Sequence, residues 1–236
     1  MSNLEYQANQ GASLWQNNPV LVQLLGLSPV LAVSNTVVNG LGLGVATAIV
    51  FILSCVTASL ARKFISYTWR FVWYLLIMAS YTTILEFLMR AYYFPLYQEL
   101  GIYVPLICCN FAILIRMEIQ SSMLNWKLTA RDSALVAAGF LLAIVLLATL
   151  REFVATGSVL NDWQLLLATP WLPEVNQSAT TGSVIFSFAN LQPAALILLG
   201  LIVAAKNMLD SRFGFGSTAE KEAVKPVTRA RVTGSL

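Results

Sequence analysis

Two adjacent cysteines, Cys108 and Cys109, lie within the apolar stretch YVPLICCNFAILIR at residues 103–116. Thiolates are the preferred ligands of iron–sulfur clusters and of many zinc ions, so a thiol pair in an apolar segment raises the question of a metal site. Free cysteines inside a protein also serve as small, polarizable packing residues. The pattern therefore leaves both interpretations open, metal ligands or packing residues.

The absence of histidine and the spacing of the cysteines exclude several kinds of metal or catalytic site. The chain contains no histidine, and its three cysteines form no CxxC motif. Histidine-ligated haem, histidine zinc sites and an imidazole proton carrier are therefore excluded. Cys55 stands alone in a long apolar run, and we interpret it as a packing residue. No residue pattern predicts a catalytic centre in this chain.

Glu86 and Arg90 are ionisable residues four positions apart, near the end of another apolar run. An ionisable residue within a membrane span is a candidate for a proton or cation pathway. A Glu–Arg pair at this spacing also forms an ion pair along a helix. We interpret the two residues as a structural pair at the membrane border, with the ion pathway as the alternative.

The composition indicates that these residues belong to a membrane protein. Of the 236 residues, 58% are hydrophobic and 11% are charged, whereas a soluble domain carries about 25% charged residues. The net charge of +3, without a basic stripe carrying aromatics, does not indicate nucleic-acid binding. We predict an all-α integral membrane protein, and we expect no cleavable signal peptide because residues 1–16 are polar.

Six apolar segments follow one another, at about residues 20–33, 37–61, 69–91, 102–115, 133–150 and 188–206. The first and fourth are short; Gly26, Ser28 and Pro29 interrupt the first, and Pro105 lies near the start of the fourth. Short, broken segments at matching positions of two halves indicate an inverted 3+3 repeat with a site near the middle of the membrane. Two ordinary kinked helices are the alternative.

The second segment begins with the small residues Gly40, Gly42 and Gly44, followed by Ala46 and Ala48. Small residues on a membrane helix let a neighbouring helix approach closely. We therefore expect this part of the second segment to pack tightly against another helix.

Six spans place both chain ends on the same side of the membrane, and charge indicates which side. Only Arg90 and Arg151 would lie on the opposite side. The remaining basic residues are Arg62, Lys63, Arg70, Arg116, Lys127, Arg131, Lys206, Arg212, Lys221, Lys225, Arg229 and Arg231. The positive-inside rule therefore predicts that both termini are cytoplasmic.

The segments suggest a simple division of the chain. Residues 1–17 are predicted to be a cytoplasmic N-terminal segment and residues 18–209 a six-helix membrane domain with an outer-face loop at about 151–187. Residues 210–236 are polar and mixed in charge, so we expect a disordered cytoplasmic tail. Within the loop, NDWQLLLATPWLP at residues 161–173 favours a short helix lying at the membrane interface.

Four blocks of the sequence resemble one family. They are NNPVLVQLLGLSPVLAVSNTVVNGLGLGVAT (residues 17–47), LYQELGIYVPLICCNFAILIRMEIQ (96–120), LREF (150–153) and QPAALILLGLIVAAKNML (192–209). They are similar to the RnfE subunits of ion-translocating ferredoxin:NAD oxidoreductase (Rnf) complexes. These subunits are related to the NqrD subunits of the Na+-translocating NADH:quinone oxidoreductase.

This resemblance implies a multi-pass subunit of the bacterial inner membrane that pairs with an RnfA-like sister of opposite orientation. The complex would couple electron flow between ferredoxin and NAD to translocation of Na+ or H+. The sister pair would share a [2Fe–2S] cluster near the membrane centre, with one cysteine from each broken helix of each partner. The chain alone would have no catalytic centre.

The chain departs from the family where the cluster ligands are expected. The family's LGLCPLLAV reads LGLSPVLAV here, so Ser28 replaces the first cysteine. Its TNC triplet reads CNF, so Asn110 is retained and Phe111 replaces the second cysteine. Serine is a poor substitute for a thiolate and phenylalanine cannot bind a metal. Ser28, Asn110 and Phe111 therefore line the family's cluster site with both usual ligands lost.

Cys108 and Cys109 are the remaining candidates for relocated metal ligands. On a regular helix Cys108 lies about one turn from Phe111 on the same face, whereas Cys109 points away from it. Cys108 could act only if the broken helix shifted its register or the cluster moved, whereas an unwound segment would relax the limit on Cys109. We expect Asn110 to bond the exposed backbone of the broken helix, because a polar group at membrane depth needs partners.

Two functions of different classes follow. The first is a membrane subunit of an Rnf-type redox pump, forming the electron-transfer and ion-translocation core with its sister. The second is a cofactor-free scaffold or transporter subunit of the same fold. Arg116 with Glu118, and Arg151 with Glu152, are interpreted as anchors at the membrane borders, with docking of neighbouring subunits as the alternative.

Overall fold

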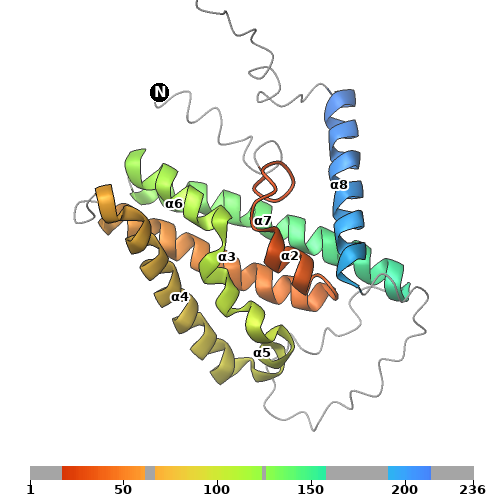
Figure 1. Ribbon diagram of the computed structural model, residues 1–236, viewed down its shortest axis with the longest axis horizontal. Helices are drawn as coiled ribbons and strands as arrows, with labels where there is room; N and C mark the ends of the chain where they lie inside the picture. The colour runs from red at the N-terminus through yellow and green to blue at the C-terminus, as the bar shows by residue number, and fades with distance from the viewer. Residues whose placement is uncertain (1–17, 62–66, 124–125, 158–190, 214–236) are drawn as a thin grey trace, which may run out of the picture.

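The computed structural model describes residues 18–61, 67–123, 126–157 and 191–213 (Figure 1). All regular structure in these ranges is helical, so the all-α prediction is confirmed. The elements are α2 (Leu27–Val33), α3 (Val37–Ala61), η1 (Tyr67–Trp69), α4 (Arg70–Tyr92), α5 (Phe94–Leu100), η2 (Gly101–Tyr103), η3 (Pro105–Cys109), α6 (Phe111–Met123), α7 (Trp126–Thr156) and α8 (Gln192–Phe213).

Five helical stretches in the described residues are long and apolar enough to cross a membrane. They are Val37–Ala61, Arg70–Tyr92, Phe94–Ile119, Trp126–Thr156 and Gln192–Arg212. The first apolar segment is different, because its helix α2 has only 7 residues. A helix of that length covers about 10 Å, whereas the hydrocarbon core of a membrane is about 30 Å thick. The first segment is therefore broken, as predicted.

The break in the first segment has a local cause. Residues 19–23 form turns, and two left-handed residues follow, Leu24 with φ 54° and Gly26 with φ 69°. A left-handed residue cannot continue a right-handed helix, and it is uncommon for a residue other than glycine. Helix α2 can therefore begin only at Leu27.

Several predicted boundaries were wrong because charged residues lie inside helices. Helix α7 begins at Trp126 rather than at residue 133, and it continues through Arg151 to Thr156 instead of entering a loop there. Three charged residues near its ends, Asp132, Arg151 and Glu152, are buried. A charge with partners inside the protein does not end a membrane helix.

The fourth and sixth segments also extend beyond their predicted ends. The fourth begins with α5 and ends with α6, and α8 continues to Phe213. The proposed N-terminal segment, the interface helix at residues 161–173 and the tail after residue 213 lie outside the described residues. The inverted relation of the two halves stays a prediction.

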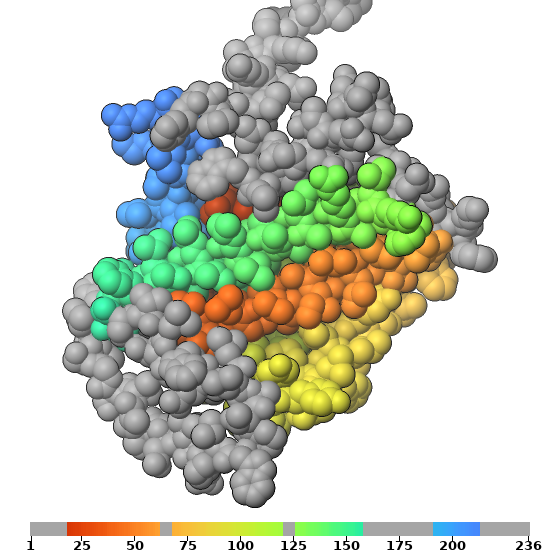
Figure 2. All heavy atoms as spheres, turned by 180° about the vertical axis from the view of Figure 1, so that it is seen from behind, coloured from red at the N-terminus to blue at the C-terminus, as the bar shows by residue number. Residues whose placement is uncertain are grey.

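Helices α3 and α7 lie side by side and antiparallel at the centre of the fold (Figures 1 and 2). A Cβ atom on Gly40 would lie 2.9 Å from the Cβ of Ala148, and one on Gly44 would lie 3.0 Å from Cγ2 of Ile144. These distances leave no room for a side chain, so glycine permits the close approach that the sequence predicted.

The contact between α3 and α7 continues to their other ends. There Thr129 Oγ1 donates a hydrogen bond of 3.5 Å to Ser59 Oγ. Gly42 lies on a different face of α3, where a Cβ would be 3.0 Å from Cδ2 of Leu96 in α5. The small residues of α3 therefore allow two neighbouring helices, α7 and α5, to approach it closely.

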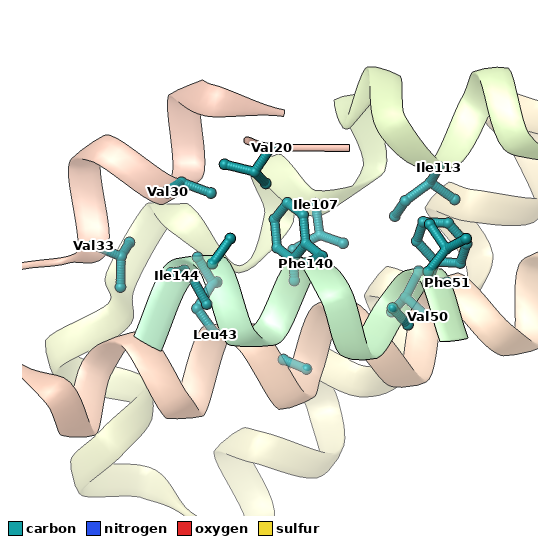
Figure 3. Packing of buried hydrophobic residues seen from close by; sticks show 14 of the residues in the cluster. Val20, Val30, Val33, Leu43, Val50, Phe51, Ile107, Ile113, Phe140 and Ile144 are labelled. Atoms are coloured by element: carbon teal, nitrogen blue, oxygen red, sulfur yellow. The ribbon is translucent and has the colours of Figure 1, made fainter. Parts of the chain in front are cut away.

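Both broken segments pack onto this central pair. Figure 3 shows Val20 of the first segment, Ile107 of η3 and Phe140 of α7 within one buried cluster. Asn18 Nδ2 donates a hydrogen bond of 2.8 Å to the carbonyl of Gly139 in α7. Asn18 Oδ1 also accepts hydrogen bonds from the backbone of the turn that follows it. The start of the first segment is thus fixed to the middle of α7.

The α3–α7 contact predicts the effect of a single methyl group. Replacing Gly40 by alanine should destabilise the protein by about 1–3 kcal/mol, because the new Cβ overlaps Ala148. The midpoint of thermal unfolding in detergent should fall, and Ala148→Gly in the same chain should recover most of the loss. Gly200→Ala is the control, since a Cβ there has no described atom within 4 Å. An unchanged midpoint for Gly40→Ala would show that the two helices are further apart.

Candidate functional site

The two broken segments touch each other at Gly26 and Asn110. A Cβ on Gly26 would lie 2.5 Å from Asn110 Oδ1 and 3.2 Å from Nδ2. Position 26 therefore excludes a side chain on steric grounds as well as through its φ of 69°. We refer to this contact as the junction. Ser28 lies two residues after Gly26 and Phe111 directly follows Asn110, so both predicted ligand positions belong to the junction.

Asn110 organises its side of the junction as the N-cap of α6. Its backbone is extended, with ψ 109°, and its Oδ1 accepts a hydrogen bond of 3.0 Å from the backbone N–H of Ala112. This is the usual role of asparagine before a helix, and it is the backbone contact expected of Asn110. The side chain is buried, and its Nδ2 has no hydrogen-bond partner among the described residues.

The two positions at which the resemblance implied cysteine lie on the surface of this chain. Ser28 is in the first turn of α2 and is exposed. Phe111 is the first residue of α6, and 58% of its surface is accessible. Neither a hydroxyl nor a phenyl ring replaces a thiolate in an iron–sulfur cluster. The residues at these positions therefore do not fit the [2Fe–2S] cluster that the resemblance implied.

The thiol pair stands directly before Asn110, at the end of η3. Cys108 is half-buried, Cys109 is exposed, and both are free cysteines. Their sulfur atoms lie 3.6 Å apart. The spacing expected from one regular α-helix does not apply here, because η3 is a 3₁₀ helix that ends at Cys109 before α6 begins. The two thiols thus lie together beside the junction.

This chain alone does not provide a complete metal site in the part that the structure describes. No group of three or more His, Cys, Asp or Glu residues is arranged there to hold a metal ion. Cys55, the remaining cysteine, is buried in the hydrophobic cluster of α3. A site with four ligands at the junction would therefore need ligands from outside the described residues.

Comparison with known proteins establishes the family. Residues 9–203 match the family described as "Rnf-Nqr subunit, membrane protein". This chain belongs to the Rnf-Nqr family. The relationship predicted from the four sequence blocks is therefore confirmed.

Individual relatives within the Rnf-Nqr family cover almost the whole chain. The E subunit of the ion-translocating oxidoreductase complex of Pseudoalteromonas atlantica is 42% identical over 97% of this chain and 98% of its own length. The proteins of the same name from Cellvibrio japonicus and Shewanella oneidensis are each 39% identical, over 100% and 99% of this chain and of their own lengths.

In this Rnf-Nqr protein, a charged pair on α7 holds the end of α2 and the start of α3. Arg151 Nη1 donates hydrogen bonds of 3.1 Å to the carbonyl of Leu31 and to Ser34 Oγ. Glu152 Oε2 accepts a hydrogen bond of 2.6 Å from the backbone N–H of Val37. Positive charge suits the carbonyls at a helix end and negative charge the N–H groups at a helix start. The expected anchoring at the membrane border was wrong, because both side chains are buried.

Arg116 lies largely inside the protein rather than acting as a border anchor, whereas Glu118 is exposed. Arg116 Nη2 lies 2.8 Å from Asp132 Oδ2, and Asp132 is 1% exposed. Glu118 pairs with Arg70 at the start of α4. These pairs tie α6 to α7 and to α4. The sequence analysis missed Asp132, although an acidic residue close to an apolar run was a signal for a buried partner.

Glu86 and Arg90 form the structural pair that was predicted, at 2.6 Å along α4. The structure adds a third member that the sequence analysis missed. Tyr97 of α5 accepts a hydrogen bond of 2.7 Å from Arg90 and donates one of 2.9 Å to Glu86. The triad joins α4 to α5 and so supports the start of the second broken segment.

The junction predicts a steric penalty at one position. Gly26→Ala should cost about 1–2 kcal/mol for the left-handed backbone, with about 1–3 kcal/mol more for the overlap with Asn110. The protein should unfold at a lower temperature in detergent. Gly200→Ala should leave the temperature unchanged. If Gly26→Ala were as stable as the parent, the two broken segments would not be in contact.

Proposed function

We propose that this chain is a membrane subunit of a redox-driven ion pump, equivalent to the E subunit of an ion-translocating oxidoreductase complex. Identity of 39–42% to three proteins of that name, over nearly their full length, supports the assignment. The chain provides no catalytic centre in its described residues. It acts within the complex, as part of the core through which electrons and Na+ or H+ cross the membrane between ferredoxin and NAD.

The junction is the single observation that carries this proposal. Helix α6 begins at Phe111 within the span Phe94–Ile119, so irregular backbone lies at membrane depth. Such backbone is tolerated only where protein covers it or a cavity is lined. Cys109, Phe111 and Ser28 are nevertheless exposed on this chain. We infer that a second protein surface covers this region, and we assign it to an RnfA-like sister subunit of opposite orientation.

The predicted charge asymmetry supplies the orientation of this chain in the membrane. With both termini in the cytoplasm of a bacterium, the buried pair of Arg116 and Asp132 lies at the cytoplasmic end of α7. Arg151 and Glu152 then lie at the opposite end, where they hold the loop between α2 and α3.

A second function is favoured by the loss of both family ligands. Ser28 and Phe111 cannot bind an iron–sulfur cluster in the family's manner. A cofactor-free scaffold or transporter subunit would need only the fold and the contact with its sister. In that case the electron path would run through other subunits.

Ion uptake by everted membrane vesicles tests the proposed function. In a strain lacking this chain, NADH- or ferredoxin-dependent uptake of 22Na+ or of protons should disappear, and the plasmid-borne wild-type chain should restore it. Gly26→Ala should lower uptake while Gly200→Ala does not, because only the first disturbs the junction. Unchanged redox-driven uptake in the deletion strain would contradict the proposal.

Measuring assembly of the complex distinguishes the pump-subunit hypothesis from the scaffold hypothesis. The amounts of the other subunits that co-purify with each variant should be measured beside ion uptake. A pump subunit predicts that Gly26→Ala lowers uptake in complexes that still assemble. A scaffold predicts that uptake falls only in proportion to the loss of assembled complex.

A further inference from the structure

Helix α7 is longer than the apolar part of a membrane. Its 31 residues span about 46 Å, whereas the hydrocarbon core is about 30 Å thick. The excess of about 16 Å, shared between the two ends, places residues 126–131 at the level of the lipid headgroups. Trp126 is 51% exposed there, in agreement with the preference of tryptophan for this depth.

Two basic residues in this part of α7 have no ion-pair partner among the described residues. Lys127 and Arg131 are both exposed, and the ion pairs that the structure describes involve other side chains. Asp132, the adjacent acidic residue, is buried and pairs with Arg116 instead. The ammonium group of Lys127 lies 5.5 Å from the centre of the Trp126 ring, a contact that leaves its charge without a counter-ion.

The positions of Lys127 and Arg131 are unfavourable for cations unless an anion is bound. The two residues are four positions apart, so their charges are neighbours on one helix face and repel each other. Lys127 also lies in the first turn of α7, where the helix dipole favours negative charge. That turn contains no acidic residue. An anion between the two side chains would relieve both effects.

The face of α7 that carries these two cations continues as an apolar surface. Ala134, Ala138 and Leu142 follow Arg131 at spacings of three or four residues, and all three are exposed. This spacing places them on the same face as Lys127 and Arg131, and Figure 2 shows α7 at the surface beside α3. A ligand held by the two cations therefore has an apolar helix surface directly beside it. An amphipathic anion fits this arrangement.

We propose that Lys127 and Arg131 bind the phosphate of an anionic phospholipid, such as phosphatidylglycerol, whose acyl chain lies along α7 over Ala134 and Ala138. A zwitterionic phospholipid carries its own cationic group, which the two basic side chains would repel. Basic residues at the border of a membrane helix favour anionic lipids by about 1 kcal/mol each. The inference concerns the lipid surface of α7, and it requires neither the sister subunit nor the proposed ion pathway.

Thermal unfolding of the purified complex, washed in detergent to remove bound lipid, tests the proposal. Added dioleoylphosphatidylglycerol should raise the unfolding midpoint. Lys127→Gln and Arg131→Gln should each raise the lipid concentration that gives half of this shift about fivefold. Arg212→Gln is the matched control, since it removes an exposed basic residue from the last turn of α8. Unchanged half-shift concentrations in both α7 variants would overturn the proposal.

Further probes separate the lipid from other sources of negative charge. Dioleoylphosphatidylcholine has the same acyl chains without the net charge, and an equal shift with it would overturn the proposal. An equal shift with inorganic phosphate would assign the site to a soluble anion and overturn it as well. Loss of other subunits from the Lys127→Gln/Arg131→Gln variant would show that a protein binds there instead. Redox-driven ion uptake reports separately on the proposed function.

Discussion

The close approach of α3 and α7 depends on Gly40 and Gly44, whose missing side chains leave room for Ala148 and Ile144. Lipid chains are as apolar as the helices themselves, so tight van der Waals packing has to hold such a pair together. The first broken segment is bonded to α7 through Asn18, and α5 and α6 pack against α3. Both sides of the junction are therefore positioned by one helix–helix contact.

Charged side chains complete this arrangement from inside the protein. Helices that end within a membrane protein leave carbonyl and N–H groups without intrahelical partners. Arg151 and Glu152 bond such groups at the α2–α3 connection, while Arg116 and Asp132 form an ion pair between α6 and α7. A buried charge is costly unless it is paired, and an unsatisfied helix end is costly as well. At the α2–α3 connection the two costs offset each other, because the buried charges of Arg151 and Glu152 bond backbone groups at the helix ends.

The same junction connects the fold to the function. This chain is similar to other members of the Rnf-Nqr family over nearly its full length. It nevertheless has Ser28 and Phe111 where the resemblance led us to expect cysteine. The fold positions a surface for a partner protein and does not by itself determine which cofactor lies there. Cys108 and Cys109 lie beside this surface, and both come from the fourth segment.

Composition, segment length and local motifs were enough to predict the membrane class, the helical fold, the family and the break in the first segment. Each of these properties depends on residues that are close together in the sequence. The partners of Arg151 and Asp132 could be identified only in the folded structure. The sequence analysis had interpreted Arg151 as a border anchor and had missed Asp132. Such contacts join residues that are far apart in the chain; Glu152 and Val37, for example, are separated by 115 positions. The structure also decided the conformation around the two thiols, since η3 is a 3₁₀ helix that ends at Cys109 and packs against α4.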